Sequence, residues 1–91
     1  MKQNLEELRQ QIDKLDEKIT SLLSKRFDTL KLIAESKFKN NITVIKQPQR
    51  EQEVLARINL SHHTYIRAVY SHLFCISCNF QEDIIKQLGG G

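Results

Sequence analysis

The stretch that decides the fold runs from Asn4 to about Asn40 and reads NLEELRQQIDKLDEKITSLLSKRFDTLKLIAESKFKN, without a Gly or a Pro. Its apolar residues recur at alternating steps of four and three, the pattern of a helix that packs along another helix: Leu8, Ile12, Leu15, Ile19 and Leu22. We call these residues the apolar seam. Asn4 and Glu7 have the spacing of a capping box, so the helix is predicted to begin there.

This helix is too long for the domain that it belongs to. At ~1.5 Å per residue it is roughly 50 Å long, whereas a compact domain of this size has a radius of gyration near ~12–13 Å. The seam therefore extends beyond the chain's own globule. The simplest way to bury the seam is to pack it against a second copy of the chain, related by a two-fold axis. The sequence therefore predicts an intertwined homodimer.

The rest of the chain also has helical character, with one Pro and three Gly residues grouped at its end. Asn40 and Asn41 are predicted to end the first helix, and residues 42–47 to form an extended connector packed by Val44. Further helices are expected at 48–60, opened by Pro48, and at 65–88, separated by the polar turn 61–64. The inward residues are predicted to be Val54, Leu55, Ile58, Ile66, Val69, Tyr70, Leu73, Phe74, Phe80 and Ile84.

These elements predict an all-α fold of one long, one short and one medium helix. Residues 1–88 are expected to form one domain, and 89–91 a flexible glycine tail. The net charge of +3 is too mild and too mixed with acids to indicate nucleic-acid binding, and it fits a small anionic ligand better. Neither a membrane span nor a signal peptide is expected, so the predicted location is the cytoplasm.

The cysteines and histidines give weaker indications. Cys75 and Cys78 form CISC, but the motif lies inside a helical pattern rather than after a strand. Buried, reduced structural thiols are therefore favoured over a redox pair or a metal site. The three histidines, at 62, 63 and 72, have no zinc-binding spacing to these cysteines, and solvated or helix-end roles are expected.

Two cations lie on or beside the buried stripe of the long helix. Arg26 and Lys37 share a face about 16 Å apart along the axis, and their desolvation requires an anion. Arg9 lies roughly 25 Å from Arg26 and about 100° around the helix, so on a straight helix it cannot reach the same ligand. Arg9 is either a surface charge or a contribution to the partner's site.

Other polar residues have ordinary explanations when each is taken alone. Arg50 and Glu51 at the start of a helix suit its capping and dipole. Ser77 and Gln81, one turn apart on one face, could be a satisfied polar pair between helices.

Taken in order, however, the segments LRQQIDKLDEKITSLLSKR, AESKFK, KQPQRE and ISCNFQ resemble the all-helical (type II) chorismate mutases over nearly the whole chain. The resemblance implies a three-helix homodimer that converts chorismate to prephenate by a [3,3]-sigmatropic rearrangement, without cofactor or metal. It implies two shared active sites, each receiving an arginine, here Arg9, from the other subunit. Such a reaction needs no nucleophile, and the expected substrate is a small dianion.

The resemblance also implies roles for individual residues. Lys37 and Gln81 are the expected catalytic pair at the ether oxygen, where negative charge develops. The remaining residues are expected to bind the substrate: Arg9, Arg26, Gln47, Arg50, Glu51 and Ser77. Gln47 departs from the family, which usually has an acid there, so reduced affinity is expected.

Two alternatives remain open from the sequence. One is an isochorismate pyruvate-lyase of the same fold, which uses a similar cationic pocket. The other is a non-catalytic helical dimerisation or regulatory module, in which only the seam matters.

Overall fold

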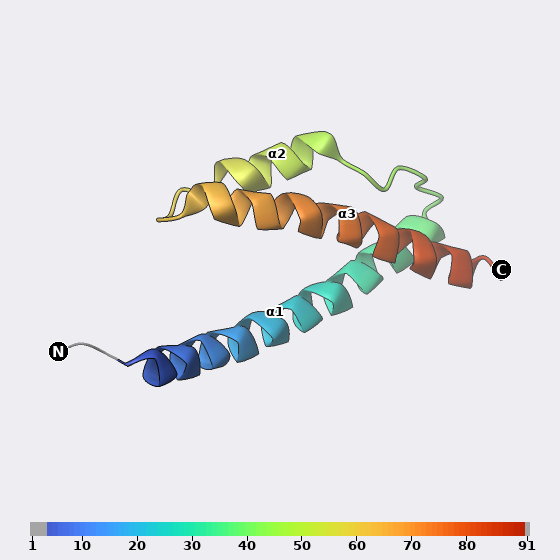
Figure 1. Cartoon of the computed structure of the whole chain (residues 1–91). Coiled ribbons are helices and arrows are strands. Elements are labelled where there is room, and N and C mark those ends of the chain that lie inside the picture. The colour runs from blue at the N-terminus through green and yellow to red at the C-terminus, as the bar shows by residue number, and fades with distance from the viewer. Residues whose placement is uncertain (1–3, 91) are drawn as a thin grey trace.

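The computed structural model describes residues 4–90, which form three helices in the order α1, α2, α3 and include no strand. The helices span Leu5–Lys39, Pro48–Ala56 and His63–Leu88. The predicted all-α class, with one long, one short and one medium helix, is confirmed. In Figure 1, α1 crosses the C-terminal half of α3, and α2 runs along the N-terminal half of α3.

The ends of α1 follow the predicted chemistry. The Asn4 side chain accepts a hydrogen bond from the Glu7 backbone N–H at 2.8 Å, which satisfies one of the free donors of the first turn. At the other end Asn41 has a φ of 58°, the left-handed conformation that Asn tolerates. The helix therefore stops one residue inside the predicted limit at Asn40.

The core of the chain lies between the C-terminal half of α1 and α3. Leu30 and Ala34 of α1 are buried with Phe74 of α3. Ala34 has no exposed surface, and its small side chain allows the two helices to approach closely. Phe27 and Phe80 extend the contact edge to face, with ring centroids 5.1 Å apart.

The helix boundaries on either side of the turn between α2 and α3 differ from the prediction. Helix α2 ends at Ala56 rather than residue 60, because the N–H groups of Arg57 and Ile58 bond to carbonyls three residues earlier, which tightens the last turn. Helix α3 begins at His63 rather than residue 65. His62 precedes it in the left-handed conformation, with a φ of 65°, and its carbonyl accepts from the Ile66 N–H.

Two predicted core residues are wrong within this chain. Val44 is 60% exposed, and its neighbour Ile45 is the connector residue that turns inward. Val69 is 65% exposed, although Tyr70 beside it is half-buried. In both places apolar composition alone did not identify which of two adjacent side chains faces the core.

The N-terminal half of α1 extends away from the other helices (Figure 1). The described chain measures 59 × 26 × 15 Å, with a radius of gyration of 17.1 Å, well above the ~12–13 Å of a compact domain of this length. All five residues of the apolar seam are exposed, from 41% at Leu8 to 63% at Leu22.

Within the part of the chain that the structure describes, no helix combines the length and the apolar character that a membrane span requires. Gly89 caps α3 and Gly90 has a φ of 79°. The third residue of the predicted glycine tail, Gly91, lies outside the described residues.

Candidate active site

A cavity of about 620 Å³ opens between the C-terminal half of α1, the connector, α2 and α3. Of the eight predicted site residues, all but Arg9 line it: Arg26, Lys37, Gln47, Arg50, Glu51, Ser77 and Gln81. They come from parts of the chain that are far apart in sequence. The fold therefore brings the predicted set into one cavity, although the role of each residue stays a prediction.

Lys37 and Gln81 form a buried polar pair in the cavity. Lys37 Nζ donates to Gln81 Oε1 at 2.9 Å and to the Ile45 carbonyl at 3.3 Å. Lys37 is 9% exposed and Gln81 6%. Because ammonium is only a donor, this contact fixes the amide orientation of Gln81 and leaves its Nε2 to donate elsewhere. Among the described residues no buried side-chain N or O atom lacks a partner, so Nε2 is not completely buried.

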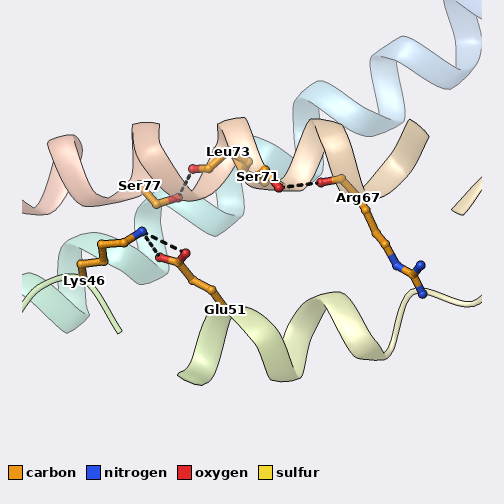
Figure 2. Close-up of polar contacts among 6 residues, drawn as sticks. All are labelled: Lys46, Glu51, Arg67, Ser71, Leu73 and Ser77. Atoms are coloured by element: carbon orange, nitrogen blue, oxygen red, sulfur yellow. Dashed lines mark hydrogen bonds and ion pairs between the residues drawn. The ribbon is translucent and has the colours of Figure 1, made fainter. Parts of the chain in front are cut away.

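One turn before Gln81 on α3, Ser77 forms a second polar pair with Arg26 of α1. Arg26 Nη1 donates to Ser77 Oγ at 2.6 Å. Ser77 Oγ in turn donates to the Leu73 carbonyl at 2.7 Å, as Figure 2 shows. The Ser77 hydroxyl is thus both donor and acceptor and holds the guanidinium at the cavity wall. The other N–H groups of Arg26 remain available to an anion.

The α2 side of the cavity is more exposed. Glu51 accepts from Lys46 Nζ through both carboxylate oxygens, at 3.1 and 3.2 Å (Figure 2). The Lys46 side chain is 65% exposed, so this pair contributes only about 0–1 kcal/mol. Arg50 pairs with Glu53 of the same helix at 3.6 Å, and both side chains are more than half exposed.

Arg9 lies outside this cavity, exposed on the overhanging half of α1. This placement agrees with the distance argument from the sequence, in which Arg9 cannot reach the ligand of its own chain.

Some cavity residues were missed by the sequence reasoning. Arg57, the C-cap of α2, adds a cation to the wall, and Tyr70 and Phe74 add an aromatic surface. The family motif gave no signal for them. The spacing Arg50–Val54–Arg57, one face of a helix, could have indicated Arg57.

The prediction that both thiols are buried is wrong, because Cys75 is exposed and Cys78 is half-buried at the cavity wall. Burial raises the pKa of the Cys78 thiol above its usual value, and the Glu51 carboxylate adds to the increase. Cys78 is therefore a neutral thiol at physiological pH. Residues 4–90 contain no group of His, Cys, Asp or Glu side chains placed to hold a metal ion.

Comparison with known proteins gives a family. The family profile described as "Chorismate mutase type II" matches residues 8–86. A curated "Bifunctional chorismate mutase/prephenate dehydratase" from Aquifex aeolicus (strain VF5) is 43% identical over 56 residues, which cover 62% of this chain and 15% of that protein. The chain thus spans only a small part of the length of this relative. No solved structure matches significantly.

Proposed function

The chain belongs to the type II chorismate mutase family, and from this premise we propose that it converts chorismate to prephenate in the biosynthesis of phenylalanine and tyrosine. The proposal includes action in the cytoplasm and needs no cofactor or metal. The observation that carries it is the convergence of Arg26, Lys37 and Gln81 on one cavity, where all three are hydrogen-bonded and Lys37 and Gln81 are buried.

Lys37 and Gln81 are proposed to stabilise the transition state. As the ether C–O bond of chorismate breaks, negative charge accumulates on its oxygen, while the substrate carries less charge there. An ammonium and an amide N–H held in place before the reaction bind this charge better in the transition state than in the ground state. Lys37 is held by Gln81 and the Ile45 carbonyl, so little reorganisation is required.

Arg26 is proposed to bind a substrate carboxylate, with Ser77 beside it. A guanidinium can contact a carboxylate through two parallel hydrogen bonds, which favours one compact conformer of the substrate. In the ligand-free chain the Ser77 hydroxyl donates to Leu73. Ser77 must redirect this proton in order to donate to a carboxylate, and otherwise it acts by orienting Arg26.

The α2 side is proposed to recognise the ring hydroxyl. Glu51 can accept this hydrogen bond while it keeps Lys46, because a carboxylate has about four acceptor positions. Arg50 and Gln47 approach from the same side of the cavity. The uncharged Gln47 leaves Arg50 without the acid that the family usually supplies there, which supports the expectation of weaker substrate binding.

We propose that the working unit is a homodimer in which the two long helices cover each other's apolar seam. The exposed seam supports this, since five large apolar residues along one helix face are costly to leave in water. In this dimer Arg9 of one copy would enter the cavity of the other and bind the second carboxylate.

The experiment is to mix purified protein with chorismate and follow its loss together with prephenate formation. Turnover is expected in the unmodified chain. Lys37→Ala should reduce kcat/KM by about 10²–10³-fold, the usual effect of removing one group that stabilises developing charge. Lys39→Ala is the matched control, because Lys39 lies in the same last turn of α1 but is exposed and outside the cavity.

The same assay separates the alternatives. Release of pyruvate from isochorismate, without prephenate formation from chorismate, would indicate the lyase. A lack of turnover by a properly folded dimer would indicate a non-catalytic module. Equal activity of the Lys37 and Lys39 variants would contradict the proposed role of Lys37.

A further inference from the structure

A single arginine of α3 connects this helix to the C-terminal end of α2. Arg67 Nη2 donates to the Ile58 carbonyl at 2.7 Å, and Arg67 Nε donates to the Leu55 carbonyl at 3.3 Å. Arg67 Nη1 lies 3.2 Å from Nδ1 of His63, one turn earlier on α3. Figure 2 shows the Arg67 side chain extending from α3 toward the segment that leaves α2.

Helix α2 has few other attachments. It has nine residues, and none of them is buried. Its backbone approaches that of α3, but among the described residues it makes no close backbone approach to α1, although both helices line the cavity. At its N-terminal end the exposed Lys46–Glu51 pair connects it to the connector. Within residues 4–90, Arg67 is the residue whose side chain hydrogen-bonds from α3 to the C-terminal end of α2.

The two carbonyls that Arg67 binds lie on either side of Arg57, the C-cap of α2. The Leu55 carbonyl also accepts from the Ile58 N–H at 3.1 Å, so Arg67 is a second donor to it. A cation also suits the negative end of the helix dipole. By holding both carbonyls, Arg67 fixes the backbone from which Arg57 lines the cavity, one turn beyond Val54. Arg67 itself does not line the cavity.

We infer that Arg67 is a positioning residue, which holds the α2 wall of the cavity at the distance from α1 and α3 that the substrate requires. The consequence for substrate affinity rests on the proposed chorismate mutase function, whereas the placement of α2 does not. Lys37 and Gln81, the groups proposed to act in the transition state, lie on α1 and α3 and do not depend on this contact.

The inference gives a specific kinetic expectation. Without Arg67 the α2 wall should sample open positions, so the binding-competent fraction falls and the apparent KM rises. Since bound substrate still meets Lys37 and Gln81, kcat should fall much less than KM rises. A purely structural role would instead lower the amount of folded protein, which reduces the apparent kcat and leaves KM unchanged.

The experiment compares Arg67→Met, Arg67→Lys and Lys86→Met in the full chain. Met keeps the apolar stem of Arg67 without its donors, and Lys keeps the charge with fewer donors. Lys86 is an exposed cation on the same helix, far from α2, and serves as the matched control. Two quantities are measured: amide hydrogen exchange of residues 48–58, and kcat and KM for chorismate.

For Arg67→Met we expect KM to rise about tenfold, which corresponds to a binding-competent fraction of about one tenth, and exchange in residues 48–58 to accelerate at least tenfold relative to α1 and α3. Arg67→Lys should recover part of both effects, and Lys86→Met should show neither. Unchanged exchange of 48–58 in Arg67→Met would overturn the inference, as would a loss of kcat at constant KM. If the unmodified chain does not turn over chorismate, the proposed function fails, and hydrogen exchange still decides the placement of α2. If Arg67→Met does not fold, exchange and KM in Arg67→Lys decide the inference by the same criteria.

Discussion

The two halves of α1 have the same kind of apolar stripe and very different surroundings. From Arg26 to Lys37 the stripe packs against α3, where Leu30 and Ala34 are buried and Lys37 has hydrogen-bond partners. From Leu8 to Leu22 every apolar side chain is at least two-fifths exposed. Periodicity therefore defines which face of a helix becomes buried, but it does not say whether the covering surface belongs to the same chain.

The comparison predicts that the N-terminal half is covered by a second copy. Leu15→Glu introduces a charge at the centre of the seam, and burying a carboxylate without a partner is unfavourable. The variant should be monomeric at micromolar concentration. Its activity per chain should fall about tenfold or more, because a tenfold loss corresponds to only ~1.4 kcal/mol and each site would lose its partner.

Gln10→Glu is the matched control for this variant. Gln10 lies on the opposite face of α1 and is also exposed, so the same added charge should leave both assembly and activity unchanged. Sedimentation velocity and the chorismate assay are the measurements. If Leu15→Glu remains dimeric, or if the unmodified chain is monomeric, the proposal that a second copy buries the seam is contradicted.

The sequence predicted most of the fold because α1 has strong and uninterrupted periodicity, and because Asn4 and Asn41 provide clear end signals. It failed where the structure depends on contacts that are distant in sequence. The end of α2 depends on its final turn and on carbonyls bound by Arg67, which no local pattern shows. The same applies to Val44 and Val69, which lie beside the residues that turn inward.

The cavity could be predicted as a set of residues, but not as a geometry. The ordered motif placed seven residues in one cavity. It did not reveal that Lys37 holds Gln81 by its oxygen, that Ser77 donates to Leu73, or that Lys46 already pairs with Glu51. Two of these contacts, Lys37 with Gln81 and Lys46 with Glu51, join different elements, and the relative placement of those elements decides them.

A mixing experiment sharpens the comparison of the two halves, because it asks whether the exposed half of one copy completes the cavity of the other. Arg9→Ala and Lys37→Ala should each be nearly inactive as homodimers. In a heterodimer one site has Arg9 from one chain and Lys37 from the other. After full exchange about half of the dimers are mixed, each with one intact site of two, so about a quarter of the original activity should return.

Subunit exchange is verified by mass spectrometry of differently tagged chains. A mixture of Lys37→Ala with Gln81→Ala is the control, because both changes lie on the same side of the shared site. In that heterodimer each cavity still lacks one of the two groups. Recovery in the control, or verified exchange without recovery in the test mixture, would contradict the contribution of Arg9 across the interface.

The smallest effect is expected on the α2 side of the cavity, where the polar groups are exposed to solvent and are not held by buried hydrogen bonds. Gln47→Asp should lower KM two- to fivefold without changing kcat, since an exposed ion pair with Arg50 is worth about 0.2–1 kcal/mol. Arg50 now pairs with Glu53 at 3.6 Å, so the new acid must compete with that contact. Gln49→Asp adds the same charge to the first turn of α2 outside the cavity, and it should leave KM unchanged. An equal decrease in KM for both variants would mean that general charge at the start of α2, and not a contact to Arg50, is responsible.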